Sequence, residues 1–167
     1  VYKRQTVAFA TIADNSTGVE MDVVTDGEAT ILAEQTGGVW NEAGTLNLSN
    51  TLIAAQGEGG NCGGSGVNSQ GYNLDDDGSC TLAGPGDLSD VDAMLASLSN
   101  YGGETPTHAL LHDSPAVDAG DPACGGSEPE WDQRRMARPV DGDADGEARC
   151  DMGAVEAVFE ADVSVQG

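Results

Sequence analysis

The sequence is poor in positive charge, in aromatic side chains and in long apolar runs. It holds 6 lysine and arginine residues against 29 aspartate and glutamate residues, which gives a formal net charge of −23. Because so acidic a surface repels polyanions, nucleic acid and anionic membranes are excluded as partners. Aromatic residues make up only 4% of the chain, so Val, Ile, Leu and Ala must build the core. No apolar stretch reaches the roughly 18 residues of a transmembrane helix.

Glycine, in contrast, is abundant. The 167 residues include 24 glycines, a content typical of folds made from many short strands and turns. The length suits one domain with a real core. Lys3, the only lysine, lies in the basic run at residues 1–5. We interpret this run as an assembly artefact at the end of a metagenomic fragment, with an ordinary basic N-terminus as the alternative.

A short phrase, apolar then small then polar, occurs three times in the first sixty residues. The copies begin at Ile12, Leu32 and Ile53, about 20 residues apart, and glycine follows each. A period of this length, with β-prone pieces and no helical period, predicts a β-solenoid. Leucine-rich repeats share the period, but they need a dense leucine scaffold that this chain lacks.

Residues 45–53 alternate apolar and polar side chains, as strands with one buried face do. Leu46 and Leu48 are therefore predicted to point into the solenoid. Asn50 is predicted to begin the next turn, where stacked asparagine side chains form ladders. We expect an all-β fold, a fragment of a right-handed parallel β-helix with coils over residues 6–60.

Beyond residue 60 the repeat gives way to a stretch rich in glycine and proline. The open end of a solenoid exposes strand edges and core, which must be covered. We therefore expect residues 61–156 to form an irregular C-terminal cap. Residues 157–167 are then a tail that leads toward an anchor.

Several phrases in the second half of the chain follow one another in a recognisable order. They are His108-Ala109-Leu110-Leu111, Ser114-Pro115-Ala116-Val117-Asp118-Ala119-Gly120, Asp132-Gln133-Arg134 with Arg138-Pro139, and Cys150-Asp151-Met152-Gly153-Ala154-Val155-Glu156. Together with the stretch from Asn61 to Cys80, they resemble the closing segment of bacterial secreted proteins that join right-handed parallel β-helix repeats to a choice-of-anchor Q region. The resemblance covers about residues 44–156. Arg135 departs from it, because the family has glycine at that place.

The resemblance implies a location and an architecture rather than a chemistry. It implies an extracellular or cell-surface protein with further β-helix coils upstream, and the family has no assigned reaction. We expect a structural, adhesin-like role, in which an elongated face contacts a cell surface or a polysaccharide, with no enzymatic activity and no required cofactor. The alternative is a fragment of a carbohydrate-active β-helix enzyme, a polysaccharide lyase or hydrolase whose catalytic coils lie upstream.

Four cysteines, Cys62, Cys80, Cys124 and Cys150, allow three pairings. In an extracytoplasmic chain the economical pairing is sequential, Cys62 with Cys80 and Cys124 with Cys150, because each bond then closes one glycine-rich loop. Free buried thiols are the alternative. The absence of any C-x-x-C pair argues against a zinc site.

An acidic turn carries carboxylates at alternate positions, Asp141, Asp143 and Asp145, and ends in a glycine. This spacing is that of the first half of an EF-hand loop, where carboxylates converge on calcium and glycine allows a sharp turn. The twelfth position is Met152 in place of the bidentate glutamate, which excludes a true EF-hand. A weak structural calcium site is predicted here, with a plain exposed acidic turn as the alternative.

Charged residues in the segments that resemble the family, which we call the family-like motifs, are predicted to hold the cap together. Arg134 and Arg138 are expected to pair with nearby carboxylates, Asp118 and Asp132, because guanidinium and carboxylate groups form bidentate bonds. No catalytic residue is predicted. A lyase would need acidic and basic residues stacked on successive coils, and the predicted coils have no lysine or arginine after residue 5.

Two histidines, His108 and His112, have the i, i+4 spacing of zinc ligands on a helix. The glutamate of the usual motif is missing, and Pro106 and Pro115 leave little room for a helix. We therefore do not expect zinc at this pair.

Overall fold

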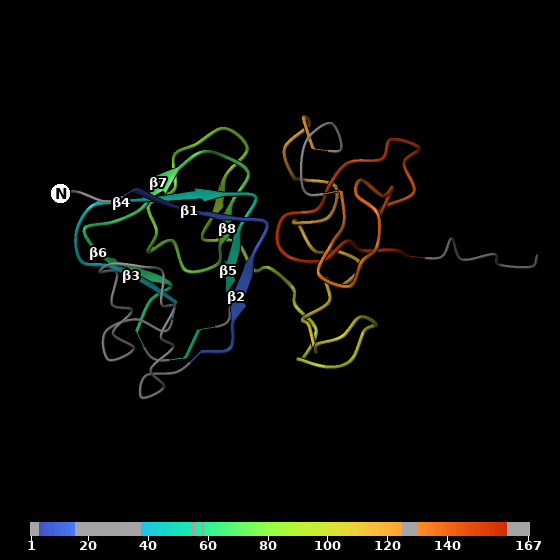
Figure 1. Ribbon diagram of the computed structural model, residues 1–167, viewed down its shortest axis with the longest axis horizontal. Coiled ribbons are helices and arrows are strands. Elements are labelled where there is room, and N and C mark those ends of the chain that lie inside the picture. The colour runs from blue at the N-terminus through green and yellow to red at the C-terminus, as the bar shows by residue number, and fades with distance from the viewer. Residues whose placement is uncertain (1–3, 16–37, 55, 58, 125–129, 160–167) are drawn as a thin grey trace, which may run out of the picture.

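The computed structural model describes residues 4–15, 38–54, 56–57, 59–124 and 130–159. Within these residues the chain has no helix and forms nine short strands (Figure 1). All paired strands run parallel, so the fold is all-β, as expected. The strands are β1 (Arg4–Ala8), β2 (Thr11–Ala13), β3 (Val39–Asn41), β4 (Thr45–Ser49), β5 (Leu52–Ala54), β6 (Cys62–Gly64), β7 (Asn68–Ser69), β8 (Leu74–Asp75) and β9 (Leu88–Ser89).

The strands form three parallel sheets, with the orders β1-β4-β7, β2-β5-β8-β9 and β3-β6. The chain passes through β3, β4 and β5, one in each sheet, and then repeats this path through β6, β7 and β8. Register partners on these two passes lie a little over 20 residues apart, as in the pairs Val39–Cys62 and Leu52–Leu74. Parallel pairing continues to β9, well past the boundary expected at residue 60.

The first copy of the repeat pairs directly with the third. Ile12 lies opposite Ile53, and Ala13 opposite Ala54, with no strand between β2 and β5. The second copy, at residues 32–35, lies outside the described residues. The expected spacing of about 20 residues between paired strands is therefore not met at this step, because Ile12 and Ile53 are 41 residues apart in the chain. The backbone groups that would receive an intervening strand are already paired between β2 and β5.

Strand β1 begins inside the run that we interpreted as foreign to the fold. Arg4 and Gln5 lie opposite Thr45 and Leu46 in the parallel register. The Asn47 side chain also donates to the Gln5 carbonyl oxygen at 2.8 Å. These two residues therefore extend the sheet, whereas residues 1–3 lie outside the described part of the chain.

The corner between the first two sheets is built in the same way on each pass. Phe9, Asn50 and Tyr72 all have positive φ, at 51°, 47° and 58°. Phe9 N donates to Ser49 O at 3.1 Å, and Asn50 N donates to Gly71 O at 3.2 Å. Left-handed backbone is costly for a residue with a Cβ. Three such residues at equivalent corners show that stacking of the passes enforces the turn.

The asparagine ladder expected at Asn50 does not form among the described residues. A pair of amide side chains lies instead in the sheet β1-β4-β7, where Asn68 is the register partner of Asn47. The Asn68 side-chain amide donates to the Asn47 side-chain oxygen at 2.7 Å. The Asn50 side chain accepts a hydrogen bond from the Asp121 N–H at 2.7 Å. Asn50 therefore serves the contact with the second half of the chain rather than the stacking of the strands.

Apolar side chains from all three sheets fill the interior between them. Leu46 and Leu48 are buried there, as predicted, and pack with Ile53 of β5. The other buried members of this cluster are Val39, Cys62 and Cys80. Because few aromatic residues are available, this interior is built from branched aliphatic side chains and one disulfide.

Strand β5 is buried on both faces. Ile53 faces the interior, whereas Leu52 and Ala54 point the other way, as alternation along a strand requires. The residues that cover this outer face come from the second half of the chain and include Ala93, Leu110, Ala116 and Met152. The second half thus lies against the outer face of the sheet β2-β5-β8-β9 (Figure 1), and not only over the end of the strands as expected.

We call residues 4–89 the strand region and residues 90–159 the flanking region. Among its described residues the flanking region has no strand and is joined internally by isolated antiparallel bridges, such as Leu95–Leu110 and Val140–Arg149. Figure 1 shows it as the yellow-to-red part of the chain. No helix that could cross a membrane occurs in the described residues.

Candidate site: a buried ionic clamp beside an acidic cluster

We call the two buried ion pairs Asp132–Arg134 and Arg138–Glu156, together with the neighbouring Asp151, the clamp. In its first half, the Asp132 carboxylate accepts several backbone N–H groups. Asp132 is buried and accepts hydrogen bonds from the N–H groups of Arg134, Met136 and Glu156 at 2.7, 2.9 and 3.0 Å. The Arg134 side chain closes on the same carboxylate through Nε and Nη2, at 2.9 and 2.7 Å. Burial opposes ionisation of Asp132, but these bonds and the Arg134 charge outweigh it and lower the pKa. Arg134 and Asp132 thus form the contact expected of them.

The second half of the clamp is a fully buried ion pair. Arg138 Nη1 lies 2.5 Å from Glu156 Oε1, and the two side chains are 1% and 0% exposed. Arg138 also donates to the carbonyl oxygens of Asp151 and Gly153, at 3.2 and 2.8 Å. Its guanidinium carbon lies 4.9 Å from the centre of the Phe9 ring. One side chain therefore joins the flanking region to a corner of the strand region.

Glu156 is the functional residue that sequence reasoning missed. The sequence favoured Asp118 and Asp132 as partners of Arg138, whereas the structure pairs it with Glu156. Glu156 also accepts two backbone N–H groups, both at 3.1 Å. A signal was available, because Glu156 is the only charge in the apolar stretch 153–159. A carboxylate in such a stretch is buried only with a partner.

The clamp contains more buried negative charge than positive charge. Burial raises the pKa of Glu156, against the attraction of Arg138. Asp151 is 1% exposed and accepts the N–H groups of Asp118, at 2.7 Å, and of Ala157. Burial, together with the charges of Glu156 and Asp118, raises the pKa of Asp151 to about 7. Asp151 therefore takes up a proton near neutral pH, which reduces the excess of buried negative charge in the clamp.

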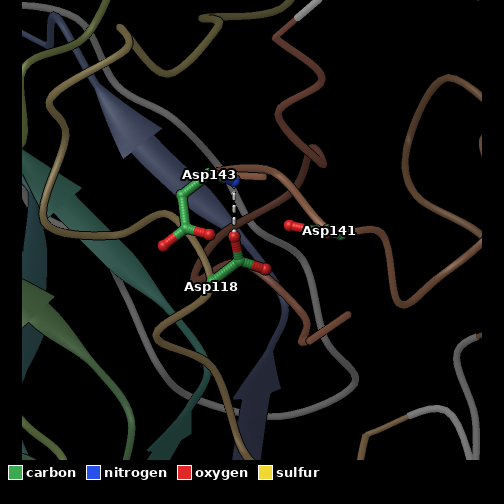
Figure 2. A group of neighbouring side chains, drawn as sticks. All are labelled: Asp118, Asp141 and Asp143. Atoms are coloured by element: carbon green, nitrogen blue, oxygen red, sulfur yellow. Dashed lines mark hydrogen bonds between the residues drawn. The ribbon is translucent and has the colours of Figure 1, made fainter. Parts of the chain in front are cut away.

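Figure 2 shows an acidic cluster, which lies beside the clamp because the Asp118 N–H donates to Asp151. One carboxylate oxygen from each of Asp118, Asp141 and Asp143 lies within 4.8 Å of the others. Asp118 Oδ2 accepts the N–H groups of Gly142 and Asp143 at 2.9 and 2.8 Å, and Figure 2 shows the second of these bonds. Burial first, and then the charge of Asp143, raise the pKa of Asp118. Asp118 is the member of the cluster that belongs to the buried interior.

The cluster contains two of the three predicted metal ligands. Asp145 lies elsewhere, with its Oδ2 3.9 Å from Arg149 Nη1. The loop is closed by Asp141, whose Oδ2 accepts the N–H of Gly146 at 3.0 Å, and Gly146 turns the chain at a φ of 96°. Asp118 takes the place of Asp145. Spacing within the acidic turn could not reveal Asp118, which belongs to an earlier phrase of the sequence.

The donor set suits a hard cation such as calcium, which takes about six to eight oxygen ligands from carboxylates and carbonyls. Asp141 Oδ1 is buried and has no hydrogen-bond partner among the described residues, so this oxygen can coordinate without breaking a bond. Asp118, in contrast, already accepts three backbone N–H groups. Sharing its oxygens in this way makes Asp118 a weaker ligand.

Both disulfides join the partners that sequence order favoured. The Cα atoms are 4.7 Å apart in Cys62–Cys80 and 6.1 Å apart in Cys124–Cys150, within the usual range of about 4.4–6.8 Å. Cys150 directly precedes Asp151 of the clamp. The second disulfide therefore ties the turn at Cys124 to the clamp.

The two histidines lie in different surroundings. His108 Nδ1 lies 2.9 Å from Ala96 O, and its Nε2 lies 3.7 Å from Asp14 Oδ2. His112 is exposed and packs against Phe159 with the two rings tilted by 45° and 4.8 Å between the ring centres. Among the described residues they do not form a common metal site.

No family model, no curated protein and no solved structure matches this chain. The resemblance to the β-helix family therefore depends on the family-like motifs alone.

Proposed function

We propose that this chain is the C-terminal part of a secreted or cell-surface β-helix protein with a structural, adhesin-like role. In this proposal the three parallel sheets are the faces of a right-handed parallel β-helix, each pass of the chain through them is one coil, and the flanking region corresponds to a choice-of-anchor Q region. Further coils upstream continue the elongated outer face. That face contacts a cell surface or a polysaccharide.

The observation that carries this proposal is that the charged residues in the family-like motifs of the second half of the chain form buried ion pairs with one another. Arg134 binds Asp132, and Arg138 binds Glu156, and all four side chains are buried or nearly so. A catalytic acid, base or charge stabiliser must reach its substrate. These groups could do so only by opening the clamp. Their role is to fasten the flanking region onto the strand region.

Two further features support a location outside the cytoplasm. The described part of the chain has two disulfides and no free cysteine, and such bonds persist mainly in oxidising compartments. The surface is strongly acidic, which suits surroundings rich in salt or calcium, where cations screen the repulsion.

The proposal includes one structural calcium ion, bound by Asp118, Asp141 and Asp143. The ion offsets the repulsion among three carboxylates and stiffens the loop that leads to Cys150. Its affinity is weak, with a dissociation constant of roughly 10⁻⁴–10⁻³ M as in extracellular modules, because Asp118 shares its oxygens with the backbone. The ion has no catalytic part.

Binding and turnover of polysaccharides separate an adhesin-like role from catalysis. The purified chain is run on affinity gels that contain a panel of bacterial and plant polysaccharides. The same polysaccharides are assayed for new reducing ends and for unsaturated sugar products. We expect retardation by at least one polysaccharide and no product. Product formation would favour the alternative, a carbohydrate-active enzyme, and the absence of any retardation would remove the glycan-contact role.

A further inference from the structure

A cleft of about 230 Å³ lies at the seam between the strand region and the flanking region. Residues Thr11, Ile12 and Asn15 line it from β2 and the turn that follows. Leu98 and His108 are among the residues that line it from the flanking region. Neither the clamp nor the acidic cluster contributes to this lining, so the cleft is separate from the site described above.

His108 gives the cleft a hydrogen-bond acceptor. Its Nδ1 lies 2.9 Å from the Ala96 carbonyl oxygen, which can only accept, so Nδ1 is the donor, and in the neutral ring Nε2 keeps its lone pair. Asp14 does not line the cleft, but its carboxylate lies 3.7 Å from Nε2 of His108 and its side chain is 58% exposed. A ligand that bonds to His108 and carries several hydroxyl groups can therefore also donate to Asp14.

The other described residues of the lining are uncharged and mixed in character. Thr107 is buried, and its hydroxyl has no hydrogen-bond partner in the described part of the chain. Thr11 Oγ1 accepts a backbone N–H at 3.0 Å, which leaves its own proton to be donated. Asn15 and Gln133 contribute side-chain amides, and Leu98, which is 57% exposed, contributes an apolar wall.

This lining suits a neutral ligand that carries hydroxyl groups on an apolar frame. Among the described residues no lysine or arginine lines the cleft, and the net charge of −23 repels anions. An ammonium group would need acceptors alone, whereas this cleft offers donors and acceptors between apolar walls. Its volume is below the roughly 300–1,000 Å³ of pockets that hold drug-sized ligands, so it admits about one ring.

We infer that the cleft binds one neutral hexopyranose residue of a polysaccharide. The apolar face of the sugar ring lies against Leu98, and sugar hydroxyls donate to His108 and Asp14. The inference rests on the proposed glycan-contact function and assigns that contact to a defined place at the seam.

Nuclear magnetic resonance of the two histidine side chains tests this directly. The full chain is titrated with the methyl glycosides of glucose, galactose and mannose, and the ring proton signals of His108 and His112 are followed. We expect saturable shifts at His108 with at least one glycoside. His112 is exposed and does not line the cleft, so it should not respond and serves as an internal reference.

A matched pair of variants distinguishes binding in the cleft from nonspecific binding to exposed leucine side chains. Leu98→Ser removes the apolar wall and should weaken binding about fivefold, whereas Leu111→Ser changes a leucine of similar exposure outside the lining and should leave binding unchanged. Equal effects of the two variants, or no shift at His108 with any glycoside, would overturn the inference that the cleft binds a sugar. If polysaccharides still retard the chain in that case, the proposed function survives with its contact elsewhere. If they do not, both fail.

Discussion

The strand region and the flanking region satisfy their buried backbone groups in different ways. In the strand region N–H and C=O groups pair between parallel strands, and the buried polar side chains are mostly amides, such as Asn47 and Asn73. In the flanking region carboxylates accept a larger share of the N–H groups, three of them at Asp132 and three at Asp118. Buried N–H groups need partners. A chain without regular strands finds its acceptors among acidic side chains.

This contrast gives part of the acidic composition a structural meaning. Asp118, Asp132, Asp151 and Glu156 are each at most 7% exposed, so they are not part of a solvated acidic face. The flanking region should therefore respond to pH, to cations and to single charge changes. The strand region, held by backbone pairing and aliphatic packing, should respond less.

Removing the buried arginine is expected to have the largest effect. Arg138→Met leaves Glu156 buried without its partner, which should lower the free energy of unfolding by about 3–5 kcal/mol. Urea denaturation measures this loss. Arg135→Met is the matched control, since Arg135 is 81% exposed and 3.7 Å from Glu104, and it should cost less than about 1 kcal/mol. Similar losses in both variants would mean that the clamp does not hold the flanking region.

The next effect is a pH dependence that comes from Asp151. The folded state keeps this proton up to about pH 7, while the unfolded state releases it near the ordinary value of 3.8. Between these values the folded state binds more protons, so the free energy of unfolding falls as the pH rises, by up to about 4 kcal/mol from this group.

Asp151→Asn has no proton to lose and isolates this contribution. The free energy of unfolding of both proteins is measured between about pH 4 and pH 8. The difference between them should shift in favour of the variant as the pH rises. Parallel curves for the two proteins would show that Asp151 does not titrate in this range.

Loss of either disulfide should cost about 3 kcal/mol, because each bond restricts the unfolded chain. The separations are 18 residues for Cys62–Cys80 and 26 for Cys124–Cys150, so the second pair should cost slightly more. Alanine replacement of one pair at a time, followed by hydrogen exchange, locates the damage. Removing Cys124–Cys150 should speed exchange in the flanking region and spare Leu48. Faster exchange at Leu48 would show that the two regions unfold as one unit.

The smallest effect is stabilisation by calcium. At concentrations about 10 to 100 times the dissociation constant, calcium should stabilise the chain by about 1–3 kcal/mol, seen as a rise in the melting temperature. Asp143→Asn should abolish the rise, and Asp145→Asn should preserve it, because only Asp143 belongs to the cluster. The reverse result would restore the ligand set predicted from spacing. No rise and no heat in calorimetry would leave only an acidic turn.

The sequence was informative where one physical rule repeats along the chain. Alternation with a period of two placed Leu46 and Leu48 in the interior, and the alignment of the first and third repeat copies matches the register of Ile12 with Ile53. How far the parallel strands extend along the chain could not be predicted from the sequence. Two-residue strands such as β7 and β8 are too short to show an alternating pattern, so the sheets continue past residue 60 without a sequence signal.

The site was predictable only in its local contacts. Arg134 and Asp132 are two residues apart, and their pairing needs little more than a turn. The partner of Arg138 and the third member of the acidic cluster come from distant phrases. Glu156 and Asp118 occupy these places because packing against the outer face of β5 brings separate turns together.

The sequence by itself determined the all-β class, the inward side of β4 and the candidate partners of the cysteines. These properties follow from periodicity and from loops closed over a few dozen residues. Only the tertiary structure decided where the flanking region lies, which carboxylates meet and which of them are buried. The Ala154 N–H reaches Thr11 Oγ1 at 3.0 Å from the far end of the chain. No local spacing can encode such a contact, because its geometry depends on how every intervening segment packs.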